Sequence, residues 1–158
     1  IKNLVRDLEG NTLVLFNYVE KHGEPLYDLI NSNVKEDRKV FFVHGGTEVV
    51  DREEVRLITE EEDNAVIVAS YGTFSTGINI KRLHNIIFAS PSKSRIRNLQ
   101  SIGRVLRKGE GKSIATLYDI ADDIGGQNYT LRHLNERVTI YNEENFKYEV
   151  IKINLKAN

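Results

Sequence analysis

The run AVIVAS, residues 65–70, is the stretch that decides the fold. It is apolar and rich in β-branched residues, which is typical of a parallel strand buried on both faces. Four more runs of this kind lie on either side of it: TLVLF (12–16), VFFVHG (40–45), NIIFAS (85–90) and SIATLYDI (113–120). Because these runs show little polar alternation, they predict a central, mainly parallel sheet.

Longer segments with helical spacing alternate with these runs, at 18–32, 48–63 and 92–107. Strands that alternate with helices predict an α/β domain with a parallel sheet flanked by helices. The tail differs, because 128–145 predicts a helix and 146–155 alternates like a half-exposed strand at the edge of the same sheet.

The composition excludes several kinds of site. The 158 residues correspond to about one domain, since domains usually have roughly 100–200 residues. The absence of cysteine excludes disulfides and thiolate metal sites, and the four histidines are scattered, so we expect no metal site. No apolar run approaches the ~20 residues of a membrane span and no signal peptide opens the chain, so we expect a cytoplasmic protein. Because the chain begins at Ile1 and contains no methionine, we expect a piece of a longer protein.

Charge is distributed unevenly along the chain. Residues 48–63 hold eight acidic and two basic side chains, which is typical of a solvated helix face. Residues 64–109 contain no Asp or Glu, but they contain eight basic residues: Lys81, Arg82, Lys93, Arg95, Arg97, Arg104, Arg107 and Lys108. Since a solvated surface normally mixes both signs, this stretch predicts a partner that carries phosphate, either a nucleic acid or a nucleotide.

The predicted helix at 92–107 has two stripes. One stripe is apolar and would pack on the sheet: Ile96, Leu99, Ile102 and Leu106. The other is basic or amide: Lys93, Arg97, Gln100, Arg104 and Arg107. Gly103 lies between them and would cost about 0.5–1 kcal/mol relative to alanine, which indicates a close approach there. Either the helix is plainly solvated, or Arg104 and Arg107 bracket one phosphoryl group with their guanidinium forks.

The segment ASYGTFSTGINIKRL, residues 69–83, follows a buried strand and predicts a loop. It offers hydroxyls and glycines that could contact a ligand: Ser70, Gly72, Thr73, Ser75, Thr76 and Gly77. It lacks the spacing of both common phosphate-binding loops, so a plain turn and a binding site are both open by pattern alone.

Four segments together resemble the motifs of superfamily 2 helicases. QSIGRVLR (100–107) resembles motif VI, of form Q-x-x-G-R-x-x-R, and ASYGTFSTGIN (69–79) resembles motif V. LVLFNYVEKHGEPLYDLI (13–30) resembles motif IV with its helix, and FVHGGTEVVDRE (42–53) resembles the strand, glycine and helix that follow it. Order and spacing agree across 13–119, so the chain resembles the second, RecA-like motor domain. Among these helicases it is most similar to the UvsW-type phage DNA helicases of recombination and repair.

The resemblance implies a role for particular residues. Arg104 and Arg107 would be arginine fingers that reach the γ-phosphate of ATP, with Gln100 beside them. Three residues would lie near the nucleotide: Gly77, Asn79 and Gly103. Four would contact the backbone of a bound nucleic-acid strand: Asn17, Gly45, Ser70 and Thr73. Asn79 departs from the aspartate that is commoner in the family at that place.

The resemblance also implies what the chain needs from outside. Neither a Walker-type lysine loop nor a D-E-x-x box occurs in the sequence. ATP and Mg²⁺ would therefore be held mainly by a first RecA-like domain of the same polypeptide. Single-stranded or branched DNA would be the nucleic acid along which the protein moves. Residues 1–124 would form the motor domain and 125–158 an extension packed on it. The alternatives are a non-catalytic nucleic-acid-binding module, an RNA helicase or restriction-type translocase, and a stand-alone enzyme acting on a small phosphorylated substrate.

Overall fold

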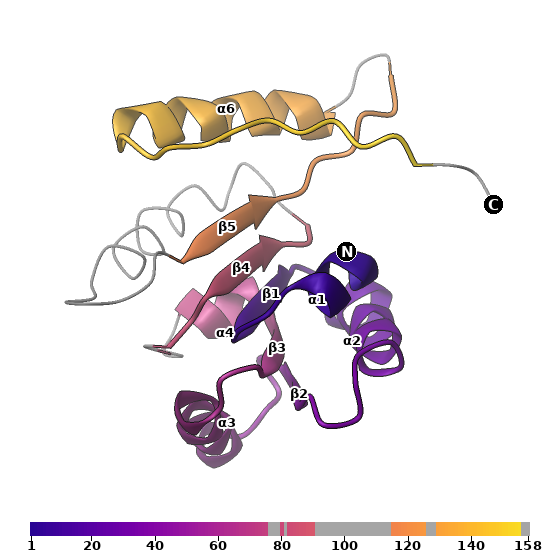
Figure 1. Cartoon of the computed structure of the whole chain (residues 1–158), viewed down its shortest axis with the longest axis vertical. Helices are drawn as coiled ribbons and strands as arrows, with labels where there is room; N and C mark the ends of the chain where they lie inside the picture. The colour runs from indigo at the N-terminus through magenta and orange to yellow at the C-terminus, as the bar shows by residue number, and fades with distance from the viewer. Residues whose placement is uncertain (76–79, 81, 91–114, 126–128, 156–158) are drawn as a thin grey trace.

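A five-stranded parallel sheet forms the centre of the computed structural model (Figure 1). The structure describes residues 1–75, 80, 82–90, 115–125 and 129–155. The strands are β1 (Thr12–Phe16), β2 (Val40–Val43), β3 (Val66–Ser70), β4 (Asn85–Phe88) and β5 (Thr116–Asp119). Their order is β2-β3-β1-β4-β5 and each described pair is parallel. The prediction of a mainly parallel sheet is therefore confirmed.

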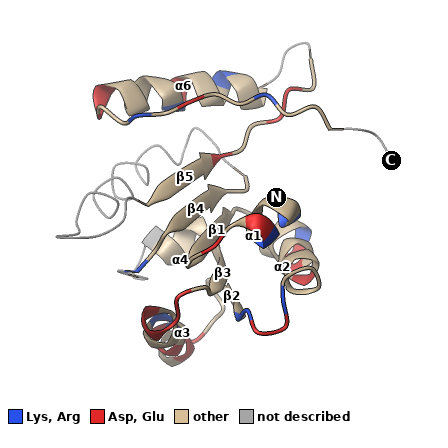
Figure 2. Ribbon diagram, in the orientation of Figure 1, with Lys and Arg blue, Asp and Glu red and all other residues tan. Residues whose placement is uncertain are grey.

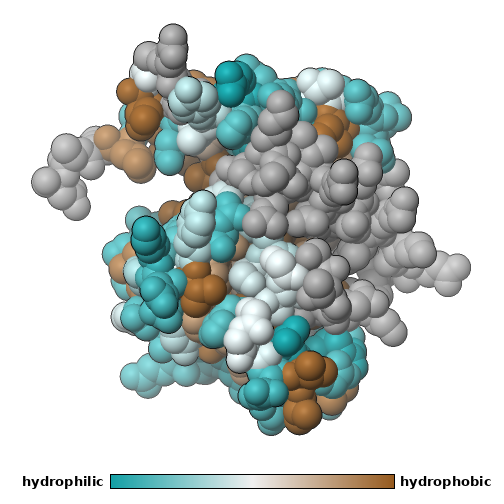
Figure 3. Space-filling view, turned by 180° about the vertical axis from the view of Figure 1, so that it is seen from behind, coloured by the Kyte–Doolittle hydropathy of each residue, from teal (hydrophilic) through white to brown (hydrophobic). Residues whose placement is uncertain are grey.

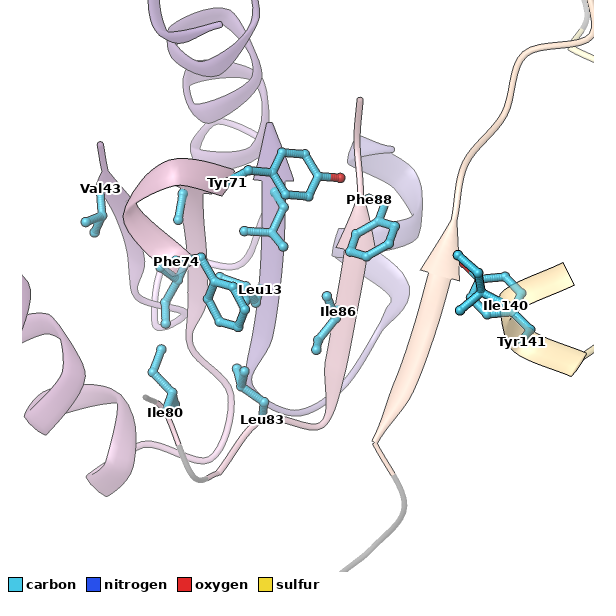
Figure 4. Packing of buried hydrophobic residues seen from close by; sticks show 13 residues of the cluster. Leu13, Val43, Tyr71, Phe74, Ile80, Leu83, Ile86, Phe88, Ile140 and Tyr141 are labelled. Carbon is cyan, nitrogen blue, oxygen red and sulfur yellow. The ribbon is translucent and has the colours of Figure 1, made fainter. Parts of the chain in front are cut away.

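Helices cover both faces of the sheet, which is why β1 and β3 are buried throughout. Side chains alternate along a strand, so Leu13 and Leu15 join one core cluster while Val14 and Phe16 join the other. The first face packs against α3 (Val49–Glu61), α4 (Tyr71–Ser75) and α6 (Tyr129–Glu143), and Figure 4 shows its cluster. The second packs against α1 (Lys2–Asp7), the π-helical turn η1 (Val19–Gly23) and α2 (Glu24–Asn31).

The predicted helices agree with the observed ones where the structure describes them. The segment 18–32 forms η1 and α2, 48–63 forms α3, and 128–145 contains α6. The predicted helix at 92–107 lies outside the described residues. No helix in the described parts of the chain is long and apolar enough to cross a membrane.

The amino edge of the sheet is closed by buried polar side chains. The amide group of Asn11, which is fully buried, lies within hydrogen-bond distance of backbone groups of Thr59, Glu62, Ala65 and Arg82. Buried Arg38 donates in the same region to the carbonyls of Val5 and Asn64. These contacts satisfy loop backbone that would otherwise be buried without partners, so this edge serves the fold.

Helix α6 is fixed to the end of β5 by a buried ionic contact. Arg137 donates to both carboxylate oxygens of Asp119, from Nε at 2.7 Å and from Nη2 at 2.8 Å. The hydroxyl of Tyr141 donates to the same carboxylate at 2.6 Å, and burial, with Asp119 beside it, raises the pKa of this phenol. Ile140 and Tyr141 join the core cluster that contains Leu13, so α6 packs on this sheet. The domain boundary at residue 124 stays a prediction.

The predicted edge strand at 146–155 is wrong, because these residues form no strand and pair with none of the described strands. Helix α6 ends in a Schellman motif, with Asn145 left-handed (φ 55°) and the Phe146 N–H donating to the Tyr141 carbonyl at 2.9 Å. This turn sends the tail back along α6, where Phe146 and Tyr148 pack on the ring of Tyr141 (Figure 1). The alternating apolar residues beyond it stay exposed: Val150, Ile151, Ile153 and Leu155.

The contact between η1 and β1 generates a prediction for stability. A methyl group added at Gly23 would lie 2.8 Å from Cδ2 of the fully buried Phe16 ring and closer still to two other ring carbons. Gly23→Ala should therefore lower the free energy of unfolding by about 1–3 kcal/mol, the usual cost of overpacking, as measured by urea titration. Gly72→Ala is the matched control, since its methyl meets nothing within 4 Å. Equal stability of the two variants would contradict this account of η1.

Candidate functional site

The described candidates for nucleic-acid contact gather at the carboxyl edge of the sheet. Asn17 directly follows β1, Gly45 lies two residues beyond β2, and Ser70 is the last residue of β3. Thr73 lies in α4, within one turn of Ser70. Because the strands are parallel and in register, these positions meet at one edge of the molecule (Figure 1). That these residues bind nucleic acid stays a prediction.

The switch point of the sheet lies between β1 and β3. After β1 the chain turns to η1 and α2 on one face, whereas after β3 it turns to α4 on the other face. Open α/β sheets bind their ligands at such a topological switch point. Phe16 and Ser70 are register partners, so Asn17 and Ser70 lie on the two sides of the switch point. The location of the switch point follows from strand order, which sequence patterns do not reveal.

Ser70 and Thr73 are brought together by a hydrogen bond between their hydroxyls at 2.7 Å. The Ser70 hydroxyl also accepts from the Thr73 backbone N–H at 3.4 Å, in the manner of a helix N-cap. The predicted loop at 69–83 instead begins with the last two residues of β3 and continues as helix α4, whose Tyr71 and Phe74 are buried in the core. The loop prediction is wrong for these residues, because apolar contacts on the sheet favour a helical turn.

Gly45 lies in an exposed turn after β2. The turn is closed by the Thr47 N–H, which donates to the His44 carbonyl, and by the His44 N–H, which donates to the Thr47 hydroxyl, each at 3.0 Å. A methyl group at Gly45 would meet nothing within 4 Å. The backbone of Gly45 therefore borders open space, as a close approach by a ligand requires.

Ser90 is a residue at this edge that sequence reasoning missed. The Asn17 backbone N–H donates to its hydroxyl at 2.9 Å, and Asn17 Nδ2 donates to its carbonyl at 2.8 Å. A signal existed in the sequence, since Ser90 ends the run NIIFAS and so follows the fourth predicted strand. The contact joins the carboxyl ends of β1 and β4.

The remaining predicted site residues lie outside the described residues: Gly77, Asn79, Gln100, Gly103, Arg104 and Arg107. The same holds for most of the basic stretch. The acidic run forms α3, where Figure 2 shows acidic residues together with basic ones. Arg56 on this helix pairs with Glu53 and Glu60. Arg82 from the basic stretch pairs with Asp63. Within the described part of the chain no group of three His, Asp or Glu side chains could hold a metal ion.

Helix α3 and the tail expose apolar side chains. Val49, Val50 and Leu57 on α3 are each more than half exposed. Figure 3 shows hydrophobic surface over this helix and, well apart from it, near the C-terminal tail.

This parallel sheet with helices on both faces is the fold of RecA-like domains. The chain is similar to the solved structure of Mss116p DEAD-box helicase domain 2 bound to an RNA duplex, with a TM-score of 0.65 and 16% identity over 89% of this chain and 50% of that one. It is also similar to the C-terminal part of the Fun30 ATPase domain, with a TM-score of 0.56 and 18% identity over 92% of this chain and 53% of that one. At these identities the two structures show the fold alone.

The family model of the helicase conserved C-terminal domain matches residues 1–109, so the chain belongs to this family. Among curated proteins it is similar to the ATP-dependent DNA helicase uvsW of Enterobacteria phage T4, with 39% identity over 160 residues. That match covers 93% of this chain and 31% of the phage protein. The chain therefore spans about a third of its relative, and the resemblance read from the motifs is confirmed.

The N-cap of α4 generates a prediction. Ser70→Ala removes the cap and leaves the buried Thr73 hydroxyl without this contact, so the free energy of unfolding should fall by about 1 kcal/mol. Ser32→Ala is the control, because it removes an exposed hydroxyl bonded to the Asp28 carbonyl and should change stability by less than about 0.5 kcal/mol. Urea titration measures both, and an unchanged midpoint for Ser70→Ala would refute the capping role.

Proposed function

We propose that this chain is the C-terminal motor half of an ATP-dependent DNA helicase or translocase. The observation that carries the proposal is its similarity, over nearly its whole length, to a phage DNA helicase. By analogy with UvsW-type helicases, the complete protein would act in recombination and repair, in the cytoplasm of the host cell if it is phage-encoded. This chain alone would not hydrolyse ATP, because its sequence contains no Walker-type lysine loop.

The ATP site would lie between this chain and a first RecA-like domain of the same polypeptide. That domain would hold ATP and Mg²⁺, while Gly77, Asn79 and Gly103 border the nucleotide from this side. Arg104 and Arg107, with Gln100 beside them, would face the γ-phosphate and stabilise the charge that develops there during phosphoryl transfer. Closure of the two domains would align the arginines, and reopening after hydrolysis would advance the grip on DNA.

The DNA strand would run along the carboxyl edge of the sheet. Backbone N–H groups and hydroxyls bind phosphate oxygens without reading sequence, which suits a motor that moves along any DNA. Two features support this edge: the exposed, open backbone at Gly45 and the switch point between Asn17 and Ser70. The hydroxyls of Ser70 and Thr73 are buried and bonded to each other, so they would fix the start of α4 at this edge as well as contact the strand.

A non-catalytic nucleic-acid-binding module is the second candidate, favoured by the stretch 64–109 with eight basic and no acidic residues. It differs from the motor half in what this chain does alone. A module would bind DNA tightly without help, and log K would fall by about 0.7–0.9 per phosphate contact against log salt. A motor half would bind weakly alone and gain affinity when joined to the ATP-holding domain. An RNA helicase would instead respond to RNA in place of DNA.

Gly45 provides a test of the DNA edge. In the two-domain protein, Gly45→Ala should weaken single-stranded DNA binding by about tenfold or more, because the methyl group blocks a phosphate from the backbone N–H. Fluorescence anisotropy measures the affinity, and the thermal midpoint should stay unchanged since the methyl meets no protein atom. Ser32→Ala removes an exposed hydroxyl at the end of α2, outside the proposed DNA contacts, and should leave the affinity intact. If the Gly45→Ala protein binds single-stranded DNA with wild-type affinity, Gly45 is not a DNA contact.

The arginines provide the test of the motor function itself. DNA-stimulated ATP hydrolysis by the two-domain protein should fall about 10³–10⁵-fold in Arg104→Ala and in Arg107→Ala, because the γ-phosphate loses a fixed positive charge. Arg82→Ala is the control, since Arg82 pairs with Asp63, which lies just after α3, and its loss should leave the rate within about twofold. If either of the first two variants hydrolyses ATP at the wild-type rate, that arginine does not act at the proposed ATP site.

A further inference from the structure

Helix α3 carries apolar side chains on the side that faces away from the sheet. Thr59 is fully buried and Val55 packs against the core cluster, so these two residues mark the inner side of the helix. At about 100° per residue, Val50 and Leu57 lie on the opposite side from Thr59. Val50 is 76% exposed and Leu57 is 51% exposed. The side of a surface helix opposite the core is normally polar, so these two side chains depart from that pattern.

Carboxylates border these apolar side chains. Glu54 and Glu61 are exposed, and helical spacing places both on the same side of α3 as the apolar pair. Neither forms an ion pair with any described residue of the chain. The nearby Arg56 does not neutralise them, because it pairs with Glu53 and Glu60. Two negative charges beside exposed apolar surface are thus left for a partner from outside.

The combination of charge and apolar surface defines the chemistry of such a partner. Residues 48–63 hold eight acidic and two basic side chains, a formal net charge of −6. This charge repels nucleic acid and anionic lipid and attracts Lys and Arg side chains. Val50 and Leu57 gain free energy when apolar groups cover them. Both conditions are met by a basic protein segment that carries apolar side chains on one side.

The extent of the surface limits the size of the partner. Helix α3 has 13 residues. Its outer side is therefore about 20 Å long and about 10 Å wide, on the order of 200 Å². A stable interface between two folded domains buries about 800 Å² on each side. The outer side of α3 is thus large enough for one short segment, whereas a second copy of this chain would need a larger contact.

We propose that the outer face of α3, formed by Val50, Glu54, Leu57 and Glu61, docks a short basic amphipathic segment of a second protein. The apolar side chains of the segment cover Val50 and Leu57, and its Lys or Arg side chains pair with the two carboxylates. Anchors about two turns apart are the means by which an amphipathic helix is recognised. The inference goes beyond the proposed motor function and does not depend on it, since none of these residues belongs to the proposed DNA or ATP contacts.

The test uses a fluorescent probe peptide of about four helical turns, made of Lys with Leu at every third or fourth position. Fluorescence anisotropy measures its binding to the two-domain protein. The double variant Val50→Gln with Leu57→Gln should bind it at least about tenfold more weakly, because Gln keeps the helix propensity and removes apolar contact. Ile153→Gln is the matched control, since Ile153 is 75% exposed in the tail, and it should leave the affinity unchanged.

The carboxylates have a test of their own. Glu54→Gln combined with Glu61→Gln should weaken binding of the same peptide about fivefold at low salt and reduce its dependence on salt, because two ion pairs are lost. A second peptide, with Glu in place of each Lys, should not bind the unaltered protein. Equal binding of the two peptides would overturn the proposal, since the charge of the partner would then be irrelevant.

The remaining outcomes decide whether the occupant is a protein segment. Wild-type affinity for the peptide in the double variant of Val50 and Leu57 would overturn the proposal. Weaker binding of single-stranded DNA by that variant would make the face part of the DNA path, and a dimer that only the unaltered protein forms in sedimentation would make the occupant a second copy; either result also overturns it. DNA-stimulated hydrolysis should stay within about twofold, so failure of the motor function would leave this inference intact. Thermal unfolding checks that the variants fold, as expected for exposed positions.

Discussion

The parallel pairing of β1 with β3 on one side and β4 on the other is the constraint on which the rest depends. Because the strands run the same way, every loop that follows a strand emerges at one edge, and every loop that precedes a strand emerges at the other. The two edges of the sheet differ in how their loops are packed. Asn11 and Arg38 close the amino edge with buried hydrogen bonds, whereas the backbone of Gly45 at the carboxyl edge borders open space.

The C-terminal part depends on the same sheet through β5. The bidentate contact of Arg137 with Asp119 is almost fully buried, and Tyr141 adds a third hydrogen bond to the carboxylate. A buried ion pair contributes little net stability when it is complete, but it fixes geometry, since removing one partner leaves a costly unpaired charge. Helix α6 is thereby held in one position on the sheet, and its Schellman end at Asn145 determines where the tail goes.

The family assignment rests on the sequence, whereas the position of the candidate site rests on the strand order. Membership of the helicase C-terminal domain family follows from residues 1–109. The strand order then places Asn17 and Ser70 at the switch point between β1 and β3. Ser90, beyond the end of β4, bonds to Asn17 and so joins the carboxyl ends of β1 and β4 beside it.

The sequence by itself determined the five strands, three of the helices and the family, because buried β-branched runs, helical periodicity and motif spacing are local signals. It failed at 146–155, where alternation predicts a strand, since a strand also needs a free partner edge and the turn at Asn145 directs the tail to α6. The sequence predicted Ser70 and Thr73 as nucleic-acid contacts, but it could not show that their hydroxyls bond to each other. Only the tertiary structure decided the strand order, the switch point and the pairing of Asn17 with Ser90, because these depend on contacts between residues far apart in the chain.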